Sequence, residues 1–246
     1  MDNIKLSIIL PVFNGAEILQ QSLEKLSAWI SGQPYKIELI VVNDGSDDTT
    51  SDILEKFKGK LDYYYTINLP KNRGKGFAVR AGIKAASGAY IVFTDTDLSY
   101  GMEIFSDMYK FMNSNKDIYL LYGSRAHSLS RGYAGYTLTR RLSSLLFSGL
   151  ARFLILPGVK DTQCGVKMFK KEFAILATEK LTVDRFAFDI EMLIIAQENH
   201  LKFQDFPVAL YHREATSVRL VKDAFSMFKD ILRMKIKSWL GRYKIK

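Results

Sequence analysis

The first half of the chain alternates short apolar runs with longer segments in which apolar residues recur every three or four positions. The apolar runs predict five strands, at Leu6 to Pro11, Ile37 to Asn43, Tyr63 to Ile67, Tyr90 to Thr94 and Ile118 to Gly123. The segments between them predict four helices, at Ala16 to Ser31, Asp48 to Phe57, Gly74 to Ala86 and Met102 to Asn113. This alternation is typical of an α/β fold with a mostly parallel sheet flanked by helices.

The end of the chain has a different pattern, which predicts a C-terminal amphipathic helical segment. Six apolar residues there recur at steps of three and four, namely Val221, Phe225, Phe228, Leu232, Ile236 and Trp239. The range 219–246 also holds nine Lys or Arg and two Asp, so it carries +7 of the net charge of +9. We therefore expect one globular domain over residues 1–218 and a basic amphipathic helix over 219–246.

The basic helix has two equal interpretations. It suits an anionic membrane surface, with the apolar stripe among the headgroups and Lys229, Arg233, Lys235 and Lys237 near lipid phosphates. Alternatively it packs on the domain and leaves a solvated basic side, and both hold if part of the stripe packs internally. Nucleic acid is not an expected partner, because no helix-turn-helix, zinc-finger or RNA-recognition signature accompanies the helix.

Other features bear on the compartment. The single cysteine, Cys164, excludes an intramolecular disulfide and favours a reducing environment. No signal pattern precedes the first strand. The longest apolar stretch, Leu142 to Leu156, is shorter than the about 20 residues that cross a bilayer, and it predicts either a membrane-surface helix or a core helix. We expect a cytoplasmic protein with peripheral contact to the cytoplasmic face of a membrane.

Two carboxylates follow the fourth predicted strand. Asp95 and Asp97 are two residues apart, so on an extended segment they point the same way and can share one Mg²⁺ or Mn²⁺. The alternative is that these acids form a turn or cap a helix. They indicate a cation and diphosphate site at the carboxyl edge of the sheet, where ligands bind in such folds.

Two further loops lie at the same expected edge. Asp44 can accept hydrogen bonds from a base N–H or a ribose hydroxyl, although it can also be a helix cap, a role that Ser46 or Asp47 would fill as well. The segment Asn-Arg-Gly-Lys-Gly at 72–76 pairs glycines with cations at a helix start, which favours anions. The P-loop ending and the Rossmann dinucleotide fingerprint are missing, which argues against an ATPase or a dehydrogenase.

As an ordered set, these loops resemble a known family. Pro-Val-Phe-Asn at 11–14, Val-Asn-Asp-Gly-Ser at 42–46, the 72–76 segment and Asp-Thr-Asp at 95–97 resemble family 2 glycosyltransferases, which have the Rossmann-like GT-A fold. Gly-Ser-Arg-Ala-His at 123–127 and the segments 161–169 and 186–191 are similar to the dolichyl-phosphate β-glucosyltransferase group. The resemblance covers nearly the whole chain.

The resemblance implies an inverting, metal-dependent enzyme that uses Mg²⁺ or Mn²⁺ and transfers glucose from UDP-glucose to a polyprenyl phosphate of the dolichyl or undecaprenyl type. Alternatives within the fold are GDP-mannose or UDP-N-acetylglucosamine as donor, or a sugar hydroxyl as acceptor. A non-catalytic nucleotide-sugar-binding module that recruits partners to membranes is a further alternative. Retention of both Asp95 and Asp97 favours catalysis.

The resemblance also implies three groups of site residues. Those for the nucleotide sugar are Pro11, Phe13, Asn14, Glu17, Asp44, Lys75, Gly76, Asp95 and Thr96. Those for catalysis are Asp97, Arg125 and Asp189, with the metal on Asp95 and Asp97. Those for the acceptor phosphate are Arg140, Arg141 and Arg213, since arginine binds phosphate bidentately.

Two of these assignments carry alternatives from the residues themselves. Each arginine can instead be a surface residue or the partner of a nearby acid. Asp189 and Glu191 are two apart on a predicted helix, so they cannot share one face, and one is expected to point into the site. Asp189 is the candidate base if the acceptor is a hydroxyl.

The sequence departs from the resemblance at two points. Eukaryotic members of the group carry an amino-terminal membrane helix that this sequence does not show, and Ser99 stands where dolichyl-phosphate mannosyltransferases often have Gln.

Overall fold

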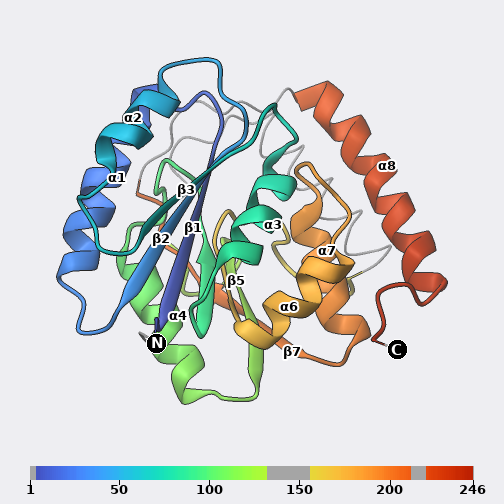
Figure 1. Cartoon of the computed structure of the whole chain (residues 1–246). Helices are drawn as coiled ribbons and strands as arrows, with labels where there is room; N and C mark the ends of the chain where they lie inside the picture. The colour runs from blue at the N-terminus through green and yellow to red at the C-terminus, as the bar shows by residue number, and fades with distance from the viewer. Residues whose placement is uncertain (1–3, 132–155, 212–219, 246) are drawn as a thin grey trace.

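The computed structural model describes residues 4–131, 156–211 and 220–245, with the side chains of 220–226 left out (Figure 1). Its described strands are β1 (Leu6–Val12), β2 (Ile37–Asn43), β3 (Tyr64–Asn68), β4 (Tyr90–Phe93), β5 (Ile118–Ser124), β6 (Lys167–Lys170) and β7 (Lys202–Pro207). Its described helices are α1 (Ala16–Ser31), α2 (Thr50–Phe57), α3 (Lys75–Ala85), α4 (Glu103–Ser114), α6 (Lys171–Lys180), α7 (Phe188–Glu198) and α8 (Leu220–Trp239).

The seven strands form one mixed sheet in the order β3-β2-β1-β4-β6-β5-β7. Every neighbouring pair is parallel except the two that involve β6, which runs antiparallel to β4 and β5. Because β6 is reversed, its first residue, Lys167, pairs with Phe93 near the carboxyl end of β4 and with Tyr122 of β5. The loop that precedes β6 therefore reaches the same edge of the sheet as the loops that follow β1, β2, β4 and β5.

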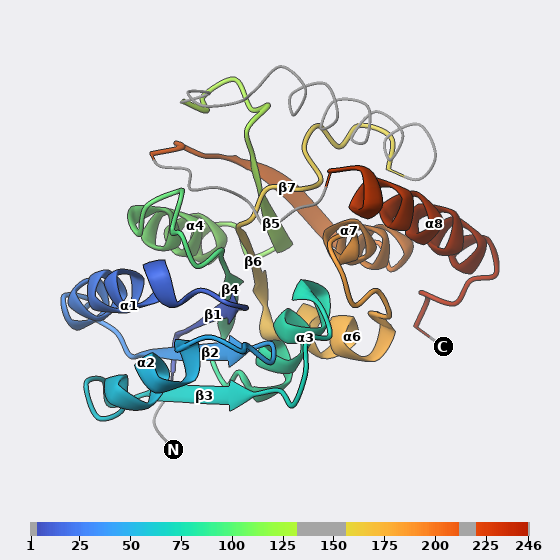
Figure 2. The same ribbon diagram turned by 90° about the horizontal axis from the view of Figure 1, so that it is seen from above.

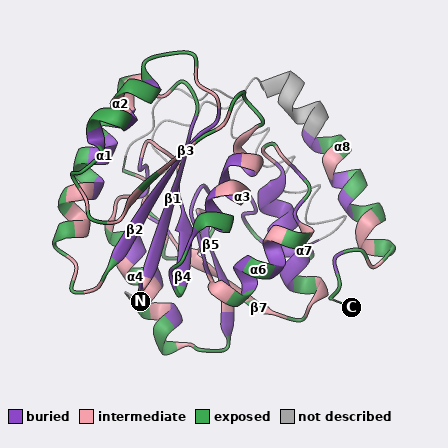
Figure 3. Cartoon of the chain, in the orientation of Figure 1, coloured by how far each residue is buried: buried purple, intermediate pink, exposed green. Residues whose placement is uncertain are grey.

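The sheet separates two apolar cores. One core contains side chains of α1, α2 and α4, and the other contains side chains of α3, α6, α7 and α8. Figure 2 shows the two helical layers on opposite sides of the sheet. Neighbouring β1 residues alternate between them, with Ile8 in the first core and Ile9 in the second, as the two-residue period of a strand requires. Figure 3 shows the central strands as buried, and because every residue of β1, β2 and β4 is buried, both faces of these strands are covered.

The structure confirms the five predicted strands and four predicted helices of the first half to within two residues at each end. The sheet is mostly parallel, as expected, and β6 and β7 are strands that the sequence analysis did not predict. Most of the Leu142 to Leu156 segment lies outside the described residues. Within the described part of the chain, no helix combines the length and apolar character needed to cross a bilayer.

The predicted C-terminal helix is α8, and it packs outside α7 at the margin of the molecule (Figure 1). Its inward-facing side chains are Met227, Ile231 and Met234, which join the second core. These residues are not members of the predicted apolar stripe. The stripe residues with described side chains are exposed, so the helix both docks on the domain and keeps an outer apolar face.

Candidate active site

Asp95 lies just beyond β4 in contact with a lysine from α3. The Nζ of Lys75 donates a hydrogen bond to Asp95 Oδ1 and forms an ion pair with it. Burial disfavours the charge on Lys75, but Asp95 and Asp189 more than offset this, so the pKa of Lys75 is raised. The Asp95 side chain is 40% exposed, so the pair opens to solvent. A lysine cation and a carboxylate therefore lie side by side at this edge of the sheet.

The loop before β6 packs against the Asp95 side chain. A Cβ atom added to Gly165 would lie 1.9 Å from Asp95 Oδ2, which is far inside van der Waals contact. Only glycine leaves room for the carboxylate where it lies. No role for Gly165 follows from the sequence pattern, because the contact joins residues that are 70 positions apart.

Asp97 lies in a tight turn that starts at Asp95 and includes Thr96. Its Oδ1 accepts a hydrogen bond from the Ser99 amide at 3.1 Å, and its Oδ2 accepts one from the Ser99 hydroxyl at 2.5 Å. The Thr96 hydroxyl donates to the Pro11 carbonyl at 2.9 Å, which ties this turn to the end of β1. Ser99 thus orients the Asp97 carboxylate. Asp97 also takes part in a turn, as the alternative interpretation of this acid predicted.

Asp189 and Lys167 form a buried ion pair close enough to Asp95 for the charges to interact. Lys167 is fully buried, and its Nζ donates to Asp189 Oδ1 at 2.6 Å and to the Cys164 carbonyl at 3.0 Å. Burial raises the pKa of Asp189, although the charges of Lys167 and Lys75 oppose the shift. Lys167 is not among the predicted site residues. The sequence feature that could have identified it is a lysine next to the apolar residues of β6, because a charge buried there needs a partner.

The two acids of α7 point to different partners, as their spacing predicts. Glu191 is fully buried and accepts hydrogen bonds from the Thr182 and Val183 amides at 2.8 and 2.7 Å and from the Tyr243 hydroxyl at 2.8 Å. Asp189 instead meets Lys167 on the side of Asp95. Glu191 therefore anchors the chain on either side of α7, and Asp189 is the acid that belongs to the candidate site.

Arg125 follows β5 and pairs with a carboxylate that the sequence analysis did not single out. Its Nε and Nη2 donate to Asp161 Oδ2 and Oδ1 at 2.7 and 2.9 Å, and its amide donates to Oδ2 at 3.0 Å. Both side chains are largely buried. This bidentate geometry matches the alternative in which the arginine partners a nearby acid.

Next to this pair, burial and the Asp161 charge raise the pKa of the Cys164 thiol to about 11, so the thiol is un-ionised at neutral pH.

Asp44 binds the start of α3. Its two oxygens accept hydrogen bonds from the Arg73 and Gly74 amides at 2.8 and 2.7 Å, and the residue is 3% exposed. Burial raises the pKa of this carboxyl against the effect of those amides. Both amides precede the first residue of α3, so Asp44 holds the segment that leads into this helix and does not cap it. Neither Ser46 nor Asp47 caps α2, so that alternative is wrong, because Asp48 accepts the Thr50 amide there.

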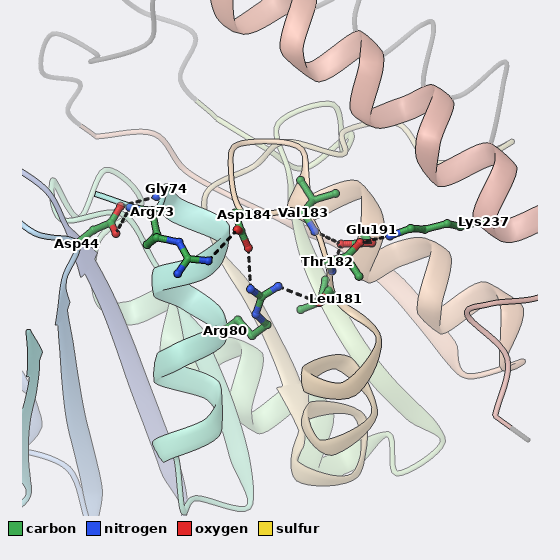
Figure 4. A network of polar contacts seen from close by, with 10 residues as sticks. All are labelled: Asp44, Arg73, Gly74, Arg80, Leu181, Thr182, Val183, Asp184, Glu191 and Lys237. Carbon is green, nitrogen blue, oxygen red and sulfur yellow. Dashed lines mark hydrogen bonds and ion pairs between the residues drawn. The ribbon is translucent and has the colours of Figure 1, made fainter. Parts of the chain in front are cut away.

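The glycines of the 72–76 segment permit a close approach by another part of the chain. Gly74 has φ of +107°, and a Cβ on Gly76 would lie 2.5 Å from the Val183 carbonyl oxygen. The Phe77 amide donates to the Asp184 carbonyl at 3.0 Å. Figure 4 shows the polar contacts that continue from Asp44 through this region to α8. The close backbone approach expected for a ligand is therefore made, at Gly76, by residues 183–185.

The loop after β1 is joined to the loop after β2. Asn14 has φ of +48°, its amide donates to the Ser46 hydroxyl at 2.9 Å, and its Oδ1 accepts the Asp47 amide at 3.0 Å. Phe13 is 45% exposed beside it, and Glu17 is exposed in the first turn of α1. The predicted nucleotide-sugar residues thus lie along one edge of the sheet.

The chemistry of Asp95 and Asp97 fits a hard divalent cation. Both offer only oxygen, both are partly exposed, and each carboxylate has lone pairs beyond those used by Lys75 and Ser99. In the described ranges, no three His, Cys, Asp or Glu side chains converge as a complete ligand set. A bound ion would therefore need further oxygen ligands from water or from a diphosphate. Arg140, Arg141 and Arg213 lie outside the described residues.

Comparison with known proteins places this chain in a family. The family model for Glycosyl transferase family 2 matches residues 7–175. The chain is 31% identical to the human dolichyl-phosphate beta-glucosyltransferase over 98% of its own length and 78% of that protein. It is 29% identical to the Dictyostelium discoideum protein of the same name over 100% of its length and 78% of that protein.

Solved structures support the fold. Glucosyl-3-phosphoglycerate synthase from Mycobacterium tuberculosis, in complex with Mn²⁺, UDP-glucose and phosphoglyceric acid, superposes with a TM-score of 0.70 at 20% identity. That match covers 99% of this chain and 81% of the synthase. The expected GT-A fold is confirmed, and this chain is an enzyme that belongs to glycosyl transferase family 2.

Proposed function

We propose that this enzyme transfers glucose from UDP-glucose to a polyprenyl phosphate, of the dolichyl or undecaprenyl type, with inversion at the anomeric carbon. The observation that carries the proposal is the match, over almost the entire chain, to proteins named dolichyl-phosphate beta-glucosyltransferase. The Lys75, Asp95 and Asp97 cluster at the carboxyl edge supports it, because a nucleotide-sugar donor needs its diphosphate neutralised there.

In the proposed reaction an oxygen of the acceptor phosphate forms a bond to C1 of the glucose. The bond from C1 to the UDP oxygen breaks, and its electron pair leaves with the diphosphate, so the α-linked donor gives a β-linked product. Lys75 lies where it can bind the diphosphate. Mg²⁺ or Mn²⁺ on Asp97, with Asp95 beside it, would add positive charge at that group when bound.

The acceptor makes a strong general base unnecessary. A phosphate monoester has a second pKa of about 6, so its oxygens are already ionised near neutral pH. Asp189 is engaged by Lys167, which suits an acid that holds the floor of the site in place. Arg125 is engaged by Asp161 and can orient the loop after β5. Arg140, Arg141 and Arg213 remain the proposed ligands of the acceptor phosphate.

The nucleotide is proposed to bind along the loops that follow β1 and β2 and at the start of α3. Phe13 offers an exposed ring, and Asp44 retains lone pairs while it holds the Arg73 and Gly74 amides in place. Pro11, Asn14, Glu17 and Thr96 complete the proposed donor site, whereas the space next to Gly76 is filled by residues 183–185. The reaction is proposed to occur at the cytoplasmic face of a membrane, where Cys164 would stay reduced.

Product analysis of the purified enzyme tests the proposal. The enzyme is incubated with Mg²⁺ or Mn²⁺, polyprenyl phosphate and, in parallel, UDP-glucose, UDP-N-acetylglucosamine or GDP-mannose. We expect lipid-extractable glucose from UDP-glucose alone, with the β anomer seen by NMR. Lipid product from another donor would overturn the choice of sugar. Free or glycan-linked product without lipid product would overturn the choice of acceptor.

A further inference from the structure

Helix α8 presents two separate apolar faces. The inner face consists of Met227, Ile231 and Met234, which are at most 8% exposed and pack into the core. An outer stripe consists of Phe228, Leu232, Ile236 and Trp239, and Trp239 is 86% exposed. A helix that only docks on its domain needs the inner face alone. The outer stripe therefore calls for a separate explanation.

The outer stripe points away from the domain. Successive helical residues are about 100° apart, so the four stripe residues span a sector of roughly 80°, centred roughly 130° from the inner face. Leu240, which is 53% exposed, extends the apolar surface at the end of the helix. Exposed apolar groups that lie contiguously, rather than singly, mark an interaction surface.

Exposed basic residues border this stripe on both sides. By the same rotation, Lys235 falls next to Phe228 at one margin, and Lys229 and Arg233 fall beyond Ile236 at the other. Long basic side chains beside an apolar stripe can place their charged ends at lipid phosphates while their methylene stems lie along the apolar surface. A tryptophan near one end is also typical of the membrane interface, where its ring is apolar and its N–H is polar.

We propose that the stripe of Phe228, Leu232, Ile236 and Trp239 is the surface that docks this enzyme on an anionic bilayer, with α8 lying in the membrane plane. Charge complementarity favours a bilayer over a protein groove, since the 219–246 segment carries +7 and borders the stripe with cations. The inference rests on the proposed function in one respect, which is that a polyprenyl phosphate acceptor must be met at a membrane.

The inner side of α8 is fixed to the region next to the donor site. Lys237 donates to the Thr182 hydroxyl, and the Thr182 amide binds Glu191 (Figure 4). The same short segment continues to Asp184, whose carbonyl accepts the Phe77 amide in the first turn of α3. A bilayer bound to the outer face of α8 would thus hold the whole domain in one orientation.

Vesicle binding tests the docking surface with a matched pair of variants. Ile236→Ser removes a stripe residue that is 57% exposed, and Ile175→Ser removes an isoleucine of α6 that is 55% exposed. We expect wild-type protein and Ile175→Ser to sediment with phosphatidylglycerol-containing vesicles. The double variant Ile236→Ser/Trp239→Ser should bind these vesicles at least about tenfold more weakly than wild type does. Equal binding by all variants would overturn the proposal.

Fluorescence provides a second measurement that leaves the stripe intact. The chain has two tryptophans, and Trp29→Phe makes Trp239 the sole reporter. We expect anionic vesicles to shift its emission to shorter wavelength and to protect it from iodide, with both effects weakened by high salt. Unchanged emission would contradict insertion of Trp239. Concentration-dependent changes without vesicles, matched by sedimentation as a dimer, would instead assign the stripe to a second copy of the chain.

Activity assays separate this inference from the proposed reaction. With a short, water-soluble polyprenyl phosphate, Ile236→Ser/Trp239→Ser should turn over like wild type, while with acceptor in vesicles it should lose at least about tenfold. If no donor yields lipid product yet vesicle binding still depends on the stripe, the proposed function fails and the docking surface stands. If product forms from vesicles equally in both proteins, the docking surface fails and the function stands.

Discussion

Gly165 lies so close beneath Asp95 that the carboxylate occupies the space of a side chain at position 165. The separation between Asp95 Oδ2 and a Cβ built at that position would be only 1.9 Å. The reversed strand β6 makes this contact possible, because it brings the segment before Lys167 to the carboxyl end of β4. A glycine in one loop thus determines the position of a candidate metal ligand in another.

Gly165→Ala should displace the Asp95 carboxylate and its ion pair with Lys75. We expect kcat/KM to fall by about 100-fold, because misplacement of a site group by about 1 Å has effects of that order. The melting temperature should change little if Asp95 moves into solvent. Gly32→Ala is the control, since a Cβ there meets only ordinary contacts at 3.6 Å or more. Full activity in Gly165→Ala would show that the Asp95 position is unimportant.

Asp97→Asn should abolish most turnover without unfolding the protein. The substitution removes negative charge from the proposed metal ligand but keeps an oxygen that can accept the Ser99 amide. We expect a loss of at least about 100-fold in kcat and a change in unfolding free energy within about 0.5 kcal/mol. The matched control is Asp107→Asn, an exposed acid on α4. Wild-type turnover by Asp97→Asn would remove this residue from the metal site.

Lys167→Met should destabilise the fold, because it leaves Asp189 buried without its partner. Removing one member of a buried ion pair costs about 3–5 kcal/mol, and the Lys167 and Asp189 side chains are 0% and 7% exposed. Urea unfolding measures the change. Lys167→Met/Asp189→Leu should recover much of the loss, since it removes the stranded carboxyl as well. A double variant that is less stable than Lys167→Met would contradict this account.

Asp161 should make stability depend on acid pH. Burial by itself would raise its pKa, but the Arg125 guanidinium outweighs burial and holds the pKa below the usual 3.8. A carboxyl with a lowered folded pKa stabilises the fold above its unfolded pKa, and this contribution is lost as the pH falls through the folded value. Asp161→Asn should therefore be less stable than wild type at pH 7.

Urea unfolding from pH 7 to pH 3 checks this prediction. The gap in unfolding free energy between wild type and Asp161→Asn should narrow as the pH falls below 3.8, because the carboxyl of the unfolded chain then takes up a proton before that of the folded protein does. Arg125→Met supplies a control, because without the guanidinium the pKa of Asp161 should rise. A gap that stays constant over the whole range would show that the ion pair does not set the pKa.

Sequence alone determined the parts of this protein that depend on local pattern. The strand and helix periods fixed the α/β class, and the loops at 11–14, 42–46, 72–76 and 95–97 identified the expected edge of the sheet. The spacing of Asp189 and Glu191 also required different partners for them, because residues two apart on a helix point in different directions.

The tertiary structure decided which residues meet across long stretches of chain. Strand β6 runs antiparallel to its neighbours, a direction that its short apolar run does not encode. Three contacts depend on that direction, namely Arg125 with Asp161, Lys167 with Asp189 and Gly165 with Asp95. The same holds for α8. Its sequence pattern predicted one apolar stripe, which contains Trp239. Packing against α7 instead buried Met227 and Ile231 and left Trp239 exposed, because burial is settled by the shape of the neighbouring surface.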